Sequence, residues 1–104
     1  MRRNHMNQMQ QMLAQAQKMQ RELAKAHAAL AEKEFPVSKG GMVELVMLGD
    51  RTVKSLVIDK DALDPENGEM LAETIALALN EALEQINAEY DAIEERITGK
   101  TGLF

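Results

Sequence analysis

The chain has 104 residues, of which 45% are hydrophobic, and a formal net charge of −5 at pH 7, with two Pro and no Cys. This length suits one small domain, and the lack of Cys excludes a disulfide framework and thiolate metal sites. No apolar run reaches the length of a membrane-spanning helix, and Arg2 and Arg3 are not followed by the apolar segment of a secretory signal, so we expect a soluble cytoplasmic protein.

Charge is unevenly distributed along the chain. Residues 1–30 have a net charge of +4, whereas the rest of the chain has a net charge of −9. The basic residues of the first part are Arg2, Arg3, Lys18, Arg21 and Lys25, and its one acid is Glu22. This asymmetry predicts a basic helix that faces one partner and an acidic body that faces another, or a chain that simply keeps its charges apart.

The first predicted element is a helix from about His5 to Lys33, because this stretch holds neither Pro nor Gly and is dominated by good helix formers. Its apolar residues recur at alternating spacings of three and four, which predicts a heptad seam: Met9, Met12, Ala16, Met19, Leu23, Ala26 and Leu30. The opposite side is polar, and Lys18, Arg21 and Lys25 lie there at positions i, i+3 and i+7. We call these three residues the basic stripe and expect it to be exposed.

Three strands are predicted to follow the helix. Pro36 ends the helix and removes a ladder donor, so residues 35–38 should form an edge strand. Residues 39–41 then form a flexible turn into a hairpin whose arms are residues 42–48 and 52–58. The expected product is a three-stranded antiparallel meander.

The pattern of the hairpin predicts its turn and its two faces. Gly49 and Asp50 should supply the positive φ and the short polar side chain that a hairpin turn needs. One face of the first arm carries Val43, Leu45 and Met47. In the second arm, strict alternation places Leu56 and Ile58 on the same face as Thr52 and Lys54.

A second long helix is predicted from about Glu69 to Ile97. Asp64 is a suitable N-cap, Pro65 suits the first helical position, and Gly99 is a plausible stop. Its apolar seam consists of Leu71, Ile75, Leu79, Ala82, Ile86, Tyr90, Ile93 and Ile97. The fold class is therefore α+β, in the order α-β-β-β-α, with residues 1–104 as a single domain and residues 1–4 and 99–104 as loose termini.

The lengths of the two helices predict self-association. Each helix of roughly 29 residues spans about 43 Å, whereas a compact domain of this size is only about 30–35 Å across. Both helices should therefore project beyond the sheet and leave part of their seams uncovered in a monomer. A two-fold homodimer is the simplest arrangement that would cover them.

No cofactor or metal site is predicted. Methionines at helical spacing near His5 are soft ligands for Cu(I), but adaptable packing explains them better. An acidic cluster includes Asp59, Asp61, Asp64, Glu66 and Glu69, but it lacks the Gly at the sixth position of a calcium loop, so helix capping explains it better. No nucleophile, base and oxyanion donors come together, so we expect a protein without enzymatic activity and without a small-molecule substrate.

The basic residues of the first helix are the one functional candidate. From sequence alone, a solvated helix face is the plainer interpretation of Arg2, Arg3 and the basic stripe. Phosphates are the alternative, because a dimer would present each cation twice to one duplex. With three aromatic residues in the chain, single-strand binding by base stacking is disfavoured. The chemistry fits salt-sensitive, largely sequence-tolerant binding of double-stranded DNA.

Several motifs occur in one order along the chain: a Gly pair, a V-x-L strand, a Gly turn, a strand that ends in Ile-Asp, the segment LDPE, and a helix that contains A-x-N-x-A. The matching residues are Gly40, Gly41, Val43, Leu45, Gly49, Ile58, Asp59, Leu63, Asp64, Pro65, Glu66, Glu69, Leu71, Ala78, Asn80 and Ala82, with residues 16–20 in the first helix. In these positions the chain resembles the YbaB/EbfC family of bacterial nucleoid-associated proteins.

The resemblance implies the α-β-β-β-α fold, a homodimer whose long helices protrude like tweezers, and binding of double-stranded DNA in the nucleoid. It names no residue as the DNA contact, so Arg2, Arg3 and the basic stripe are our own assignment. The alternative function is a dimeric adaptor or chaperone-like protein that binds other proteins through its acidic body and uncovered seams. Neither interpretation involves a membrane.

Overall fold

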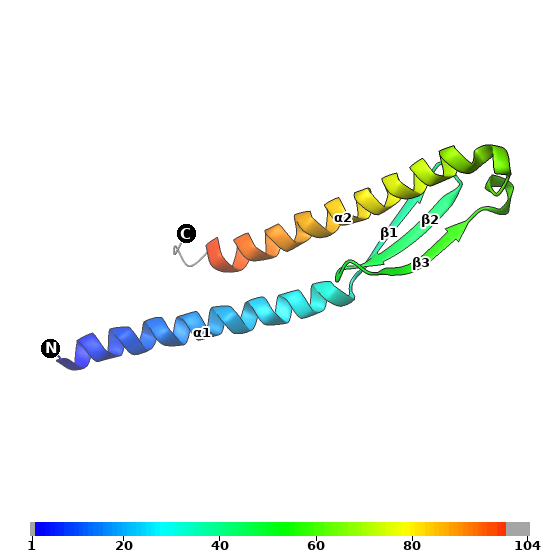
Figure 1. The fold of residues 1–104 in the computed structure, drawn as a ribbon. Helices are drawn as coiled ribbons and strands as arrows, with labels where there is room; N and C mark the ends of the chain where they lie inside the picture. Colours follow the sequence, from blue (N-terminus) through cyan, green and yellow to red (C-terminus); the bar gives the residue numbers. More distant parts are fainter. Residues whose placement is uncertain (1, 100–104) are drawn as a thin grey trace.

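The structure is a computed structural model that describes residues 2–99, with side chains from Asn7 onward. Its elements are α1 (Arg2–Glu32), β1 (Glu34–Lys39), β2 (Val43–Leu48), β3 (Val53–Ile58), the short 3-10 turns η1 (Lys60–Ala62) and η2 (Pro65–Asn67), and α2 (Gly68–Thr98). The strands form an antiparallel sheet in the order β1-β2-β3 (Figure 1). The predicted α+β class and element order are confirmed.

The helix ends differ slightly from the prediction. α1 begins at Arg2, so residues 2–4, which we expected to be loose, belong to the helix. The expected loose tail from Lys100 lies outside the described residues. Pro36 lies in β1, which has a free edge, as predicted from its missing N–H donor.

The hydrophobic core lies between α2 and one face of β1 and β2. Phe35 and Val37 of β1 alternate with outward residues and point toward the helix, as do Val43, Leu45 and Met47 of β2. From α2, the core receives Ala78, Ala82, Ile86, Ile93 and Ile97. α2 covers β1 and β2 more than β3, which is mostly exposed.

Tyr90 departs from the predicted seam of α2. It is 36% exposed and lies on the flank of the helix, whereas Thr74 and Ala78, which we did not include in the seam, are buried. The hydroxyl of Thr74 is satisfied within the helix, because it donates to the Met70 carbonyl at 2.8 Å. The sheet crosses α2 obliquely, so the buried side of the helix shifts along its length and one fixed seam does not describe it.

The predicted alternation in β3 is wrong for its first residues. A bulge interrupts the pairing of β2 with β3 between Val46 and Met47, so Met47 pairs with Val53 rather than with Lys54. Val53 therefore joins Leu56 on the inner face of the sheet. Lys54 lies on the outer face instead, where its Nζ is 3.0 Å from a carboxylate oxygen of Glu34 in β1.

Gly49 has a different function from the one we predicted. The positive φ in this turn belongs to Arg51, at 68°, and not to Gly49. A Cβ atom on Gly49 would lie 1.7 Å from the carbonyl oxygen of Leu30 in α1. Glycine is needed here because the hairpin turn approaches the backbone of α1 more closely than any side chain permits.

The close approach of the turn caps the end of α1. The backbone N–H of Gly49 donates to the Lys33 carbonyl at 2.9 Å, and that of Asp50 donates to the Ala31 carbonyl at 3.2 Å. These two carbonyls have no partner within the helix, because it ends here. The hairpin thereby holds the root of α1 at one end of the sheet.

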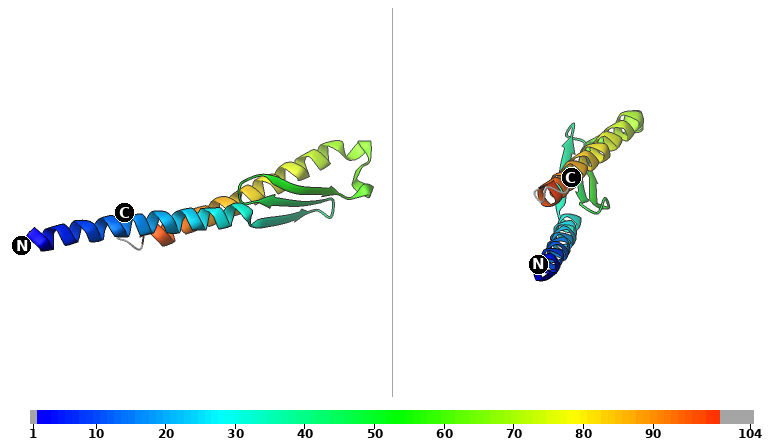
Figure 2. Two further views of the ribbon diagram at one scale, coloured as in Figure 1. Left: turned by 90° about the horizontal axis from the view of Figure 1, so that it is seen from below. Right: turned by 90° about the vertical axis from the view of Figure 1, so that its left-hand side faces the viewer.

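The two long helices extend in the same direction from the sheet, and α1 extends further (Figures 1 and 2). The molecule measures 79 × 20 × 14 Å and has a radius of gyration of 21.5 Å, against about 13 Å for a compact chain of this length. The second half of α2 packs against the second half of α1, and the N-terminal half of α1 continues alone. In the described residues, no helix is long and apolar enough to cross a membrane.

Candidate nucleic-acid interface

The basic stripe lies on the projecting helix α1, and its three side chains are exposed. Lys18 and Lys25 are seven residues apart, so the stripe runs for about 10 Å along the helix. Arg2 and Arg3 belong to the first turn of α1, and their side chains lie outside the described residues. The structure thus brings Lys18, Arg21 and Lys25 together on one surface and leaves the position of the two arginine side chains open.

Several lysines of the body are neutralised by carboxylates. The Nζ atoms of Lys33 and Lys39 lie 2.6 Å and 3.1 Å from carboxylate oxygens of Glu89 and Glu81 in α2. Lys54 is paired with Glu34, as described above. By contrast, the stripe residues form no ion pair with any residue that the structure describes. Their charges are therefore available to an external anion.

A groove between α1 and α2 adds a cation that our sequence analysis missed. Its lining residues are Ala26, Ala29, Leu30, Lys33, Glu89, Ala92, Ile93 and Arg96. The three alanines keep the groove open, and the exposed Arg96 stands on its α2 side. Lys25 directly precedes the lining residue Ala26, so the stripe ends next to the groove along α1.

The position of Arg96 could have been inferred from the seam of α2. Arg96 directly precedes the buried Ile97 and follows Ile93 by three residues, which places it at the edge of the apolar face. Our prediction named basic residues of the first helix alone. The antiparallel contact of α2 with α1 brings this single arginine to the groove between the two helices.

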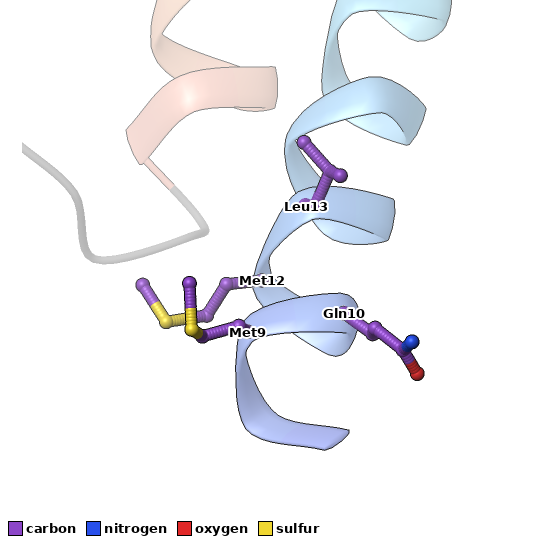
Figure 3. Close-up of a pocket in the computed structure, with 4 residues that line it drawn as sticks. All are labelled: Met9, Gln10, Met12 and Leu13. Atoms are coloured by element: carbon purple, nitrogen blue, oxygen red, sulfur yellow. The ribbon is translucent and has the colours of Figure 1, made fainter. Parts of the chain in front are cut away.

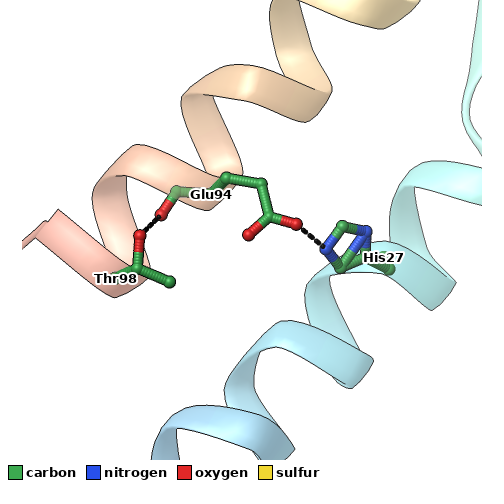
Figure 4. A network of polar contacts seen from close by, with 3 residues as sticks. All are labelled: His27, Glu94 and Thr98. Carbon is green, nitrogen blue, oxygen red and sulfur yellow. Dashed lines mark hydrogen bonds and ion pairs between the residues drawn. The ribbon is translucent and has the colours of Figure 1, made fainter. Parts of the chain in front are cut away.

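A polar cluster also joins the two helices (Figure 4). The Nε2 atom of His27 in α1 lies 3.0 Å from a carboxylate oxygen of Glu94 in α2. The ring of Tyr90 meets the His27 ring edge-on, with centroids 4.6 Å apart, and the Arg51 guanidinium lies 5.9 Å from the Tyr90 ring. A hydrogen bond with the Glu94 carboxylate, together with its negative charge, raises the pKa of Tyr90.

The predicted capping function of the acidic cluster is confirmed for two of its residues, Asp59 and Asp64. A carboxylate oxygen of Asp59 accepts a hydrogen bond from the Asp61 N–H at 2.9 Å, and one of Asp64 accepts from the Glu66 N–H at 2.9 Å. These bonds start η1 and η2, so Asp64 caps a 3-10 turn that leads into α2 rather than α2 itself. The described residues contain no group of three His, Asp or Glu side chains that could hold a metal ion.

The N-terminal half of α1 also exposes an apolar surface. Met9, Met12 and Leu13 are 63%, 67% and 61% exposed. In Figure 3 the Met9 and Met12 side chains extend to one side of the helix, and Gln10 extends to the other. The seam that packs against α2 near Leu30 is thus continued toward the free end of α1 by apolar residues that nothing in the described chain covers.

The fold and this surface together define a small α+β protein that carries an unpaired basic stripe on a projecting helix. Its family follows from sequence comparison. The profile of the YbaB/EbfC DNA-binding family matches residues 6–101. The chain belongs to this family, and the resemblance seen in its motifs is confirmed.

Named relatives are similar over most of their length. A nucleoid-associated protein of Enterococcus faecalis is 46% identical over 88 residues, which cover 84% of this chain and 85% of the relative. A nucleoid-associated protein of Metamycoplasma arthritidis is 37% identical over 86 residues, which cover 83% of this chain and 90% of the relative. A third, from Mycoplasmopsis pulmonis, is 39% identical over 94 residues, covering 90% and 92% of the two chains.

Proposed function

We propose that this chain is a non-enzymatic nucleoid-associated protein that binds double-stranded DNA as a homodimer, largely without regard to sequence. The observation that carries the proposal is the exposed, unpaired basic stripe on a projecting helix of a member of a DNA-binding family. The names of the relatives support a location in the nucleoid. Arg2, Arg3 and the basic stripe are the proposed DNA contacts, and Arg96 extends them onto α2.

The amino-acid composition of the projecting part of α1, which we call the arm, favours contacts with phosphates. Lys and Arg side chains at phosphates hold a protein on the duplex without reading its bases. The first 21 residues contain no Asp or Glu, so this part of α1 presents no carboxylate that would repel the backbone. The exposed Glu22 is the one acid within the span of the stripe. Tyr90 is engaged with His27, so it is not a free platform for a stacked base.

The exposed surface of a single chain supports the homodimer. Its accessible area is 7915 Å², whereas a compact monomer of 11.6 kDa exposes about 5,800 Å². The excess is more than the roughly 800 Å² per partner that a standard interface buries. A dimer would place two basic arms on one particle, and two arms hold a duplex more firmly than one.

The strand β3 is the proposed centre of the dimer interface. It has a free edge, Lys54 is its one charged residue, and Val53, Leu56 and Val57 are 49%, 42% and 56% exposed. A long apolar strand with a free edge is normally covered in a soluble protein. Leu79 and Leu83 of α2 pack against the core and are themselves only partly buried.

The first test measures affinity for duplex DNA across a salt series. Replacing Lys18, Arg21 and Lys25 together by Gln should weaken binding and lower the log–log salt slope by up to about 0.9 for each phosphate that the variant no longer neutralises. Arg96→Gln should produce a smaller change of the same kind.

A variant of the body serves as the control. Replacing Lys39 and Lys60 by Gln removes charge from the body outside β3 and should leave the slope unchanged. A reduction per removed charge equal to that of the stripe variant would disprove the site and attribute the effect to net charge. If the unaltered protein binds no duplex even at low salt, the DNA-binding proposal is wrong and the protein-binding adaptor takes its place.

The second test concerns the dimer. Leu56→Asp should convert the protein to a folded monomer in sedimentation, because it places a carboxylate in the proposed interface while the side chain is accessible in the single chain. Leu77→Asp is the control, because Leu77 is an exposed leucine, at 61%, that belongs to α2 and not to β3. A monomeric unaltered protein at micromolar concentration would rule out the homodimer.

A further inference from the structure

His27 of α1 contacts α2 nine residues away from Lys18, the first residue of the basic stripe. Among the described residues, two polar side-chain contacts join α1 or the residue directly after it to α2, namely Lys33 with Glu89 and His27 with Glu94. The first is at the root of α1. The second is six residues, or about 9 Å, further out along the arm. It is the last polar contact before α1 continues alone toward Lys18.

The strength of the contact between His27 and Glu94 depends on whether the imidazole is protonated. The His27 and Glu94 side chains are 28% and 36% exposed, so water reaches both groups, and the contact is an ion pair only while the imidazole is protonated. Protonation of the imidazole would convert this contact into a charge-assisted hydrogen bond, which is stronger than a neutral one.

The surroundings of His27 hold it against Glu94. From α2, Tyr90 packs edge-on against the imidazole, and Asp91 lies close enough to act on Tyr90. From the β2–β3 turn, Arg51 lies over the Tyr90 ring and donates a hydrogen bond to the side-chain oxygen of Asn87 at 2.7 Å. The residues one turn from His27 on α1 are Leu and Ala, so no charged side chain at these positions competes with His27 for Glu94.

A change at the contact of His27 with Glu94 would displace the basic stripe. Lys18 is nine residues beyond His27, or about 13 Å, and the intervening seam residues Met19 and Leu23 are only partly buried. A small change in the angle of α1 at His27 therefore moves the stripe by a larger distance. None of His27, Tyr90 and Glu94 lines the groove or belongs to the basic stripe, so changing them removes no proposed phosphate contact.

We propose that His27 is a positioning residue whose protonation, acting through Glu94, sets the angle between α1 and α2 and thereby the spacing at which the basic stripe meets DNA. This inference rests on the proposed DNA-binding function. In the protonated state the arm is held against α2 and the stripe has a defined position. In the neutral state the contact weakens and the positions of the arm spread.

The arm angle can be measured without DNA. Because the chain has no Cys, Gln17→Cys and Glu95→Cys would carry one spin label each on α1 and α2. The distance distribution between the labels should be narrower at about pH 5.5 than at about pH 8.5. The difference should vanish in His27→Asn and in Glu94→Gln. A distribution that is the same at both pH values in the otherwise unaltered chain would overturn the proposal.

The consequence for DNA is measured in the unlabelled protein. Affinity should be about threefold higher at the lower pH, in keeping with one accessible ion pair, and His27→Asn should remove that difference. Glu94→Gln separates the two explanations, because it keeps the charge of the imidazolium and removes its partner. If the pH effect persists in Glu94→Gln, the charge of His27 acts on DNA directly and the proposal is wrong.

His5→Asn is the matched control, since His5 is the other histidine of the chain and lies on the same arm. His5→Asn should keep the pH dependence of the distance between the spin labels and the part of the pH dependence of DNA affinity that depends on His27. Failure of the positioning role of His27 and failure of the DNA-binding function can be distinguished. A protein that binds DNA equally at both pH values refutes the positioning role alone. A protein that binds no DNA refutes the DNA-binding function, and the distances between the labels then decide whether His27 sets the angle of α1.

Discussion

α1 and α2 have the same length and similar apolar seams, but their surroundings differ. Each has 31 residues. α2 buries Thr74, Ala78, Ala82, Ile86, Ile93 and Ile97, whereas Leu30 is the one buried residue on the described part of α1. α2 crosses the sheet and then meets α1, so it has a neighbour over nearly its whole length. α1 leaves the sheet at its root and soon has none.

The two helices show that the spacing of an apolar seam does not by itself determine how deeply its residues are buried. Along α1, exposure falls from 67% at Met12, through the partly buried Met19, to 5% at Leu30. The spacing is the same throughout, so the gradient comes from the neighbour and not from the pattern. The uncovered half is also the half without acids, which suits an arm that meets an anionic partner.

The largest effect is expected where α1 is held to the body. In Gly49→Ala the new Cβ would overlap the Leu30 carbonyl, and the turn would have to withdraw from the end of α1. We expect the free energy of unfolding, measured by urea denaturation at fixed protein concentration, to fall by more than about 3 kcal/mol.

Gly68→Ala is the matched control for the turn. Gly68 has helical backbone angles, and nothing lies within 4 Å of a Cβ there, so this substitution should stabilise the protein by about 0.5 kcal/mol. If Gly49→Ala were equally harmless, the turn would not hold the root of α1.

A pair of truncations tests the two seams directly. Ile86 is fully buried in α2, so Ile86→Ala should cost about 3 kcal/mol of unfolding free energy. Met12→Ala, at an equivalent seam position of α1, should cost less than about 0.5 kcal/mol because the side chain is exposed. Thermal denaturation followed by circular dichroism measures both. A similar cost for the two would mean that the free end of α1 is covered in solution.

The smallest effect is expected at Tyr90, where the helices meet. Tyr90 is the only tyrosine, and there is no Trp, so its phenolate absorbance at alkaline pH is unambiguous. The Glu94 carboxylate raises the pKa of Tyr90 above its usual 10.0, and Glu94→Gln should lower it toward that value.

The sign of the linked stability follows from that raised pKa. The contact favours the neutral hydroxyl, so its contribution is fully present below the usual pKa of tyrosine and is lost as the pH rises through the raised one. A Tyr90 pKa that is unchanged in Glu94→Gln would show that the hydroxyl does not contact Glu94 in solution.

Much of the fold could be predicted because it depends on one element at a time. Pro36 defined an edge strand through its missing donor, and Asp64 with Pro65 defined a helical start through local hydrogen bonding and φ. The basic stripe follows from spacing alone, and its exposure agrees with the structure. Its contact with DNA stays a prediction.

The parts that could not be predicted depend on two elements at once. Gly49 is required by the carbonyl of Leu30, nineteen residues earlier in the chain, and the bulge at Lys54 depends on the register against β2. His27 and Glu94 are sixty-seven residues apart, and Arg96 borders the groove only because α2 lies beside α1.

The amino-acid sequence alone thus specifies the elements, their order, the faces that can be buried and the segregation of charge, because periodicity and capping act within a few residues. The packing of the whole chain determines which half of each seam is covered, which lysines are neutralised and which residues join the arms. These features depend on distances between atoms that are remote in the chain, and the close approach of one backbone to another sets those distances.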